Sequence, residues 1–177
     1  MTRAAATLWA IVCFCLTASS PPAVAVPTNV DPTPPSVAVL NFELIDTSLE
    51  GASRGVDPSE TARLTLISDL LRELLNKSSR YKVLDLRPAA AKIADAGLID
   101  GCNGCDISIA RSLGADRVMT GTIRKISTLI LIITIFERDV MTGRTLQVAT
   151  AQIRGDTNES WTRGVAWLVR NRLLAQQ

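Results

Sequence analysis

Two cysteines three positions apart are the residues of this chain best suited to chemistry. Cys102 and Cys105 lie in the segment 100–106, whose sequence is DGCNGCD. Such a pair can form a disulfide, exchange disulfides with another thiol, or supply two thiolates to a zinc site. The chain contains no histidine, so two thiolates could not complete a tetrahedral zinc site without a second subunit. We therefore expect no metal site.

The N-terminus predicts the compartment of the protein. Arg3 provides a positive start, an apolar stretch follows at 8–16, and a Pro-Pro pair ends the apolar region. The stretch has the length of a signal peptide and is too short to span a bilayer. Small residues at Ala23 and Ala25 favour cleavage after Ala25, so we interpret 1–25 as a signal peptide and expect the protein in the periplasm. A retained N-terminal anchor is the alternative.

An oxidising compartment favours a structural disulfide between Cys102 and Cys105. The Asn103-Gly104 centre gives the small ring the backbone freedom that it needs. Thiol–disulfide exchange stays open as the alternative, because Cys105 at a helix start would gain thiolate stabilisation from the helix dipole. The pair is expected between two helices rather than after a strand, and aspartates flank it on both sides. Both features argue against exchange.

Charge and composition argue against several other functions. Without Arg3, the mature chain has 18 basic and 17 acidic side chains, a net charge of +1. The basic residues are spread singly with few aromatic neighbours, so we expect no nucleic-acid ligand. No glycine-rich phosphate loop is present, and no cofactor is implied. Glu43 and Asp46 are interpreted as solvated loop acids rather than as a catalytic pair, so we expect no enzyme.

The mature chain divides into a proline-rich leader at 26–35 and a single domain at 36–177. The hydrophobic pattern of this domain predicts an α/β (α+β) sandwich, with a mixed sheet of about five strands packed with helices in the order β-α-β-α-α-β-β-β-α. The expected strands are 37–44, 81–86, 115–124, 128–136 and 144–153, and the expected helices begin near 57, 89, 106 and 157.

Local signals predict how the strands pair. The sequence DPSE at 57–60 combines a cap residue, a proline at the first helical position and an early glutamate. Because this helix joins the first two strands, we expect them to be parallel. The last three strands should form an antiparallel meander. The strand 128–136 is apolar on both faces, and we interpret it as a central core strand rather than a membrane hairpin or an assembly edge.

The closing helix carries one candidate partner residue. Its start is marked by DTNE at 156–159, and Trp161, Val165 and Leu168 form its main apolar stripe. Trp167 lies off this stripe. It is therefore a candidate for a partner surface, while a helix buried broadly against the sheet is the alternative that stays open.

The order of elements and several short motifs resemble a broad group of bacterial envelope domains. This group includes the curli-secretion lipoprotein CsgG, the N-terminal domain of TolB, and periplasmic activators of penicillin-binding proteins. The matching motifs are VAVLNF at 37–42, RYKVLD at 80–85, LGADRVMTGTI at 113–123, and Asp139 with TGR at 142–144. The segments NGC at 103–105, LGAD at 113–116 and RGDTNESW at 154–161 look like a proteobacterial family of exported proteins of unknown function.

This resemblance covers nearly the whole mature domain, and its motifs are structural rather than catalytic. It implies an envelope accessory module with an α/β sandwich fold. The chain lacks the lipidated cysteine and evident pore hairpins of the curli channel, so channel activity is not expected. We thus interpret the protein as a periplasmic accessory or interaction protein that binds an envelope protein and has no membrane span after signal cleavage. The partner and the oligomeric state are not predicted.

Overall fold

A computed structural model describes residues 33–175 of the chain. The predicted signal peptide, 1–25, and most of the predicted leader, 26–35, lie outside the described residues. The strands are β1 (Ser36–Asp46), β2 (Lys82–Val83), β3 (Arg117–Lys125), β4 (Ile130–Asp139) and β5 (Thr145–Arg154). The helices are α1 (Leu49–Arg54), α2 (Pro58–Lys77), α3 (Ala90–Ala96), α4 (Cys105–Ser112) and α5 (Asn158–Leu168), with a 3-10 turn η1 (Arg87–Ala89) and a π-helical turn η2 (Val169–Leu173).

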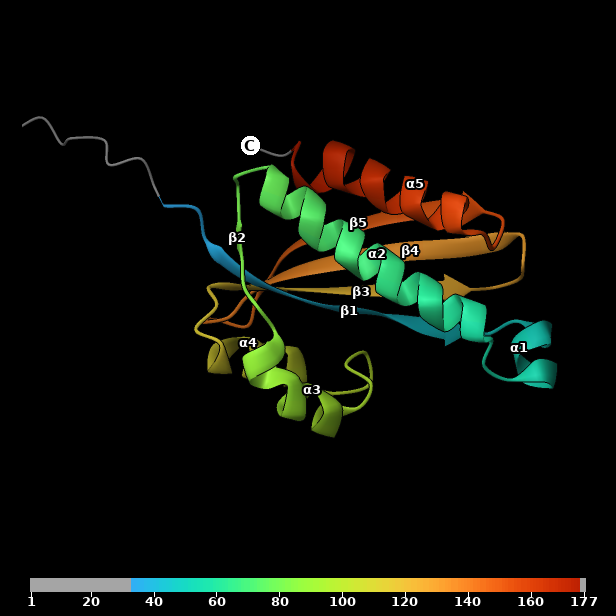
Figure 1. Cartoon of the computed structure of the whole chain (residues 1–177), viewed down its shortest axis with the longest axis horizontal. Helices are drawn as coiled ribbons and strands as arrows, with labels where there is room; N and C mark the ends of the chain where they lie inside the picture. The colour runs from blue at the N-terminus through green and yellow to red at the C-terminus, as the bar shows by residue number, and fades with distance from the viewer. Residues whose placement is uncertain (1–32, 176–177) are drawn as a thin grey trace, which may run out of the picture. The chain divides into compact units, whose positions relative to one another are not determined.

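The five strands form one mixed sheet in the order β2-β1-β3-β4-β5. β1 pairs in parallel with both β2 and β3, and β3, β4 and β5 form an antiparallel meander. Helices α2 and α5 cover one face of the sheet, and α3 and α4 lie on the other (Figure 1). The predicted fold class, the parallel first pair and the meander are confirmed.

Two helix starts follow from their capping residues. The Asp57 side chain accepts a hydrogen bond from the Ser59 backbone N–H at 2.8 Å, directly before Pro58 opens α2. The Thr157 hydroxyl accepts from the Ser160 N–H at 3.2 Å and starts α5. Each cap satisfies an amide that the helix leaves without a partner. Both starts agree with the sequence-based expectation.

Two elements differ from the expectation. A short helix, α1, lies between the first expected strand, 37–44, and the helix expected near 57, where no helix was predicted. The Ser48 hydroxyl caps it by accepting from the Gly51 N–H at 3.0 Å. A six-residue helix is too short for apolar periodicity to reveal it. β2 has two residues rather than six, since Asp85 accepts from the Arg87 N–H at 3.0 Å and turns the chain into η1.

Two glycines allow close packing on the α2–α5 face of the sheet. Gly121 of β3 pairs with Phe42 of β1, and a Cβ on Gly121 would lie 2.3 Å from the Phe42 ring. A Cβ on Gly164 of α5 would lie 2.6 Å from Ile133 of β4. Only a hydrogen at each position leaves space for these side chains. The core therefore depends on both glycines.

β4 is central in the sheet, as predicted, but it is covered on one face only. Leu131, Ile133 and Ile135 are fully buried in the cluster that includes α2 and α5. Ile132 on the opposite face is only partly buried, and Ile130 is 39% exposed. On that side α4 packs on β1 and β3. β4 is therefore an interior core strand whose apolar residues on the second face stay partly exposed.

Candidate functional site

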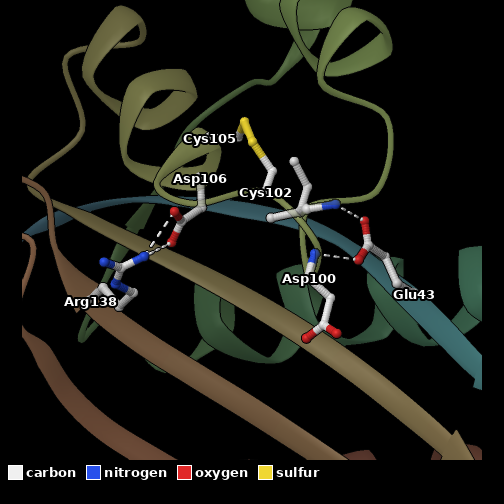
Figure 2. The surroundings of a disulfide bond; sticks show 7 residues. Glu43, Asp100, Cys102, Cys105, Asp106 and Arg138 are labelled. Carbon is white, nitrogen blue, oxygen red and sulfur yellow. Dashed lines mark hydrogen bonds and ion pairs between the residues drawn. A yellow bond between two sulfur atoms is a disulfide. The ribbon is translucent and has the colours of Figure 1, made fainter.

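Cys102 and Cys105 form a disulfide in the loop between α3 and α4 (Figure 2). Their Cα atoms are 5.6 Å apart, within the usual range for a disulfide. Gly104 has φ 87°, a left-handed conformation that favours glycine, and Cys105 is the first residue of α4. The predicted position between two helices is confirmed. The bond thus joins the loop to the start of α4.

Glu43 holds the other end of this loop against the sheet. Its carboxylate accepts hydrogen bonds from the backbone N–H groups of Ile99, at 2.6 Å, and Asp100, at 2.8 Å (Figure 2). Hydrogen bonds from two amides to an ionised carboxylate are strong. Glu43 belongs to β1 and is partly buried. Its interpretation as a solvated loop acid is therefore wrong.

Asp106 and Arg138 connect the start of α4 to the end of β4. Both carboxylate oxygens of Asp106 accept from Nη1 of Arg138, at 2.9 and 2.8 Å (Figure 2). Arg138 also donates to the Gly143 carbonyl in the β4–β5 turn. A buried carboxylate in the first turn of a helix is further stabilised by the helix dipole. The disulfide loop is therefore tied to the sheet on both sides.

The disulfide loop and the sheet line an open pocket of about 240 Å³. Its lining includes Glu43, Cys102, Asp106, Phe136 and Arg138. Of its charged groups, Glu43, Asp106 and Arg138 already bind the loop or each other, and Asp100 belongs to the loop itself. The pocket brings together no nucleophile with a neighbouring base, so its arrangement is that of a structural clamp.

A buried charge cluster lies at the carboxyl ends of β1 and β3. Nζ of Lys125 is 2.5 Å from Glu60, 3.6 Å from Asp46 and 3.6 Å from Asp156. Asp156 also pairs with Arg63 at 2.5 Å. Lys125 is 5% exposed and Glu60 is 2% exposed. Asp46 is therefore not a solvated loop acid either, and no local sequence pattern links the other four residues, which come from distant segments of the chain.

The pKa shifts in this cluster follow from burial and from the excess of carboxylates. Burial raises the pKa of Glu60, and the hydrogen bond from Lys125 only partly opposes this. Burial would lower the pKa of Lys125, but its bond to Glu60 and the charges of Glu60, Asp46 and Asp156 outweigh burial and raise it. Lys125 is therefore a charged ammonium that several carboxylates stabilise.

A second pocket, of about 580 Å³, opens beside this cluster between β1, α1 and α2. Open α/β sheets often bind ligands at the carboxyl ends of their parallel strands. The charged groups Asp46 and Glu60 in its lining already bind Ser48 and Lys125. Among residues 33–175, no group of three or more His, Cys, Asp and Glu side chains is arranged to hold a metal ion.

Another buried polar pair lies at the opposite end of β1. The Tyr81 hydroxyl donates to Oε2 of Glu137 at 3.2 Å. Burial, together with the Glu137 charge, raises the pKa of Tyr81 to about 12. Burial also raises the pKa of Glu137, and the Tyr81 bond opposes this shift. The pair joins the start of β2 to β4, and no local sequence pattern predicts it, because the two residues are 56 positions apart.

Trp167 lies on the outer surface of α5 and is 42% exposed, whereas Trp161 on the same helix is fully buried. The Arg172 guanidinium lies over the Trp167 ring, 5.6 Å from its centre. The carbonyl of Arg172 accepts a hydrogen bond from the Gln147 side chain of β5 at 2.7 Å. The Trp167–Arg172 pair is therefore connected to the edge strand of the sheet.

The structure defines a mixed α/β domain whose disulfide loop is bonded to the sheet. The chain belongs to the family DUF3280, described as "Protein of unknown function (DUF2380)", whose model matches residues 35–173. The predicted membership of a family of unknown function is confirmed. A search of curated proteins found no match. Among the described residues, no helix has both the length and the hydropathy needed to cross a membrane.

Several solved structures are similar to this chain. The LpoB C-terminal domain from Salmonella enterica has 14% identity and a TM-score of 0.49, covering 68% of this chain and 83% of that one. TolB from Acinetobacter baumannii has 15% identity and a TM-score of 0.45, covering 80% and 29%. Lipoprotein GNA1162 from Neisseria meningitidis has 18% identity and a TM-score of 0.44, covering 79% and 99%. We infer no function from these similarities, and the resemblance to CsgG stays a prediction.

Proposed function

We propose that this protein is a non-enzymatic accessory protein of the bacterial envelope that binds another envelope protein in the periplasm. The observation that carries the proposal is the disulfide loop, which Glu43 and the Asp106–Arg138 pair hold against the sheet. Disulfides persist in oxidising compartments, and the predicted signal peptide, 1–25, supports export. Trp167, on the surface away from this loop, is the proposed partner contact.

The disulfide in this proposal is structural. Its loop is already bonded to the sheet at both ends, so the Cys102–Cys105 bond orders the turn and the start of α4. Cys105 does sit at a helix start, which favours a thiolate, but the adjacent Asp106 carboxylate disfavours one. The loop also lacks a preceding strand. Thiol–disulfide exchange is therefore the weaker candidate.

Replacing both Cys102 and Cys105 with serine should leave partner binding intact. A bridge that closes so few residues removes little loop entropy, so we expect a loss of about 2 kcal/mol or less in the free energy of unfolding. Urea denaturation with and without reductant measures this loss. Reductant should shift the wild-type midpoint toward that of the double variant and leave the variant unchanged. Loss of partner binding by the folded double variant would contradict a structural disulfide and favour thiol–disulfide exchange.

A photo-crosslinking residue at position 167 tests the proposed function in intact cells. We expect the exported protein to begin at Val26 and to form a discrete adduct with an envelope protein. Arg87 on η1 provides a control position, because its side chain is 91% exposed and lies on a different element. Retention in the cytoplasm, no adduct from position 167, or the same adducts from both positions would contradict the proposal.

A further inference from the structure

The two edges of the sheet differ in how their backbone groups are occupied. Beyond the two residues of β2, side chains of α2 cover the edge of β1. Arg72 donates to the Val39 carbonyl at 3.1 and 2.9 Å, and the Ser68 hydroxyl accepts from the Phe42 N–H at 2.9 Å. These bonds occupy groups that could otherwise pair with another strand. The β1 edge is therefore closed along its first half, from Val37 to Phe42.

The other edge, β5, is open. Gly155 donates to the Leu129 carbonyl at 3.2 Å, and antiparallel bonding alternates along the register from that pair. The backbone groups of Val148, Thr150 and Gln152 consequently point away from β4. Within residues 33–175 these outward groups have no hydrogen-bond partner. At the end of β5 the Arg154 carbonyl is occupied, because it accepts from the Ser160 hydroxyl at 2.7 Å.

β5 also lacks the residues that commonly protect an edge strand. Its sequence, TLQVATAQIR, contains no proline and no lysine, and its charge is confined to the last residue. A register shift occurs only near its start, opposite Glu137 and Arg138. Natural edge strands are usually blunted by proline, charge or bulges. The remaining stretch of β5 can therefore pair with an added strand.

The charges around β5 select the kind of strand that can bind. Three arginines surround this strand: Arg144 precedes it, Arg154 ends it, and Arg172 lies beside Gln147. None of the three forms an ion pair among the described residues. The acids nearby are already engaged: Glu159 pairs with Arg163 at 3.2 Å, and Asp156 lies in the buried cluster. A second copy would bring two such sets of arginines together, which disfavours self-pairing.

We propose that an extended acidic segment of the envelope partner binds here as a sixth strand. The β5 edge surface comprises the outward backbone groups at 148, 150 and 152 with Arg144, Arg154, Trp167 and Arg172. The backbone groups supply affinity, the arginines select negative charge, and the exposed Trp167 ring supplies apolar contact area. This proposal deepens the proposed function and rests on it. The leader at 26–35 is a poor occupant, because it has four prolines and one acid.

Synthetic peptides test the strand addition on the mature chain. The probe is a labelled peptide of alternating threonine and valine with two glutamates at each end, and its control carries lysines instead. By fluorescence anisotropy we expect the glutamate peptide to bind at least about ten-fold more tightly, with the difference shrinking as salt rises. Two further peptides are N-methylated at alternate positions. Only the one whose free amides face β5 should retain binding.

Variants of β5 locate the site. Thr150→Pro removes one outward N–H without removing a bond to β4, so peptide binding should weaken by about ten-fold while the urea midpoint is kept. Should this variant not fold, the double reversal Arg144→Glu/Arg154→Glu should switch the preference to the lysine peptide. Arg54→Glu/Arg87→Glu makes the same change of net charge on α1 and η1, and it should leave peptide binding unchanged.

Four outcomes would overturn the strand proposal. The first is that the glutamate peptide does not bind, and the second is that the two N-methylated peptides bind equally well. The third is that the protein sediments as a dimer and the Thr150→Pro variant as a monomer. The fourth is that the protein binds anionic lipid vesicles through the arginines and does not bind the peptide. Crosslinking from position 167 tests the proposed function independently of the strand proposal. If only the strand proposal is wrong, crosslinking from position 167 still captures an envelope protein; if the function is wrong, that adduct is absent.

Discussion

Lysine in place of Ile133 should prevent the chain from folding into a soluble protein. Ile133 is fully buried in β4, and its side chain packs so closely on α5 that a Cβ at Gly164 would lie 2.6 Å from it. An ammonium there would lose its water without gaining a carboxylate. We expect a loss of more than about 4 kcal/mol in the free energy of unfolding. Soluble yield, circular dichroism and urea denaturation measure the effect.

The neighbouring residue provides a matched control. Ile132 faces the opposite side of the sheet and is only partly buried, so a lysine there can extend into water. Ile132→Lys should fold with a loss of about 1 kcal/mol or less. A soluble, cooperatively folded Ile133→Lys protein would mean that this face of β4 is exposed and that α5 does not cover it.

Replacing Lys125 with methionine should be the second most damaging change. The substitution removes the ammonium and leaves Glu60, Asp46 and Asp156 close together, with only Arg63 paired to Asp156. Breaking a buried pair by removing one partner leaves an uncompensated charge, and we expect a loss of about 3 to 5 kcal/mol. Urea denaturation at neutral pH measures it.

The pH dependence of Lys125→Met gives a sharper test. Burial raises the pKa of Glu60, and Lys125 is the group that holds this pKa down. Without the ammonium the folded state binds the Glu60 proton more tightly. Tighter binding of this proton stabilises the folded variant. The stabilisation is complete at pH values below the unfolded pKa of Glu60, near 4.5, and is lost as pH rises through the folded pKa of Glu60. The deficit of the variant relative to wild type should therefore narrow as pH falls.

An exposed ion pair provides the control for this variant. Lys77 pairs with Glu73 on the surface of α2, and such pairs contribute about 0.5 kcal/mol or less. Lys77→Met should therefore have little effect at any pH. A deficit of Lys125→Met that stays constant between neutral and acidic pH would show that lost packing, rather than unpaired carboxylates, causes it.

Local chemistry accounts for what could be predicted from the amino-acid order. Asp57 and Pro58 define the start of α2 through the geometry of a helix cap, which depends on adjacent residues only. The helix between the first two strands implies their parallel pairing, since a long connection through a helix returns the chain to the same end of the sheet. Local helix signals on both sides likewise predict the position of the Cys102–Cys105 segment between two helices. Period, caps and connection lengths are properties of neighbouring residues.

Contacts between distant segments decided the rest. Glu43 meets the amides of Ile99 and Asp100, and Lys125 meets Glu60, only after the sheet has brought them together. The alternation of β4 and β5 shows which residues share a face, but it does not show whether a helix covers that face. Coverage and edge protection depend on where α2, α4 and α5 pack. The open β5 edge beside Trp167 is therefore a result of tertiary packing, because no local pattern records which backbone groups are left without a neighbour.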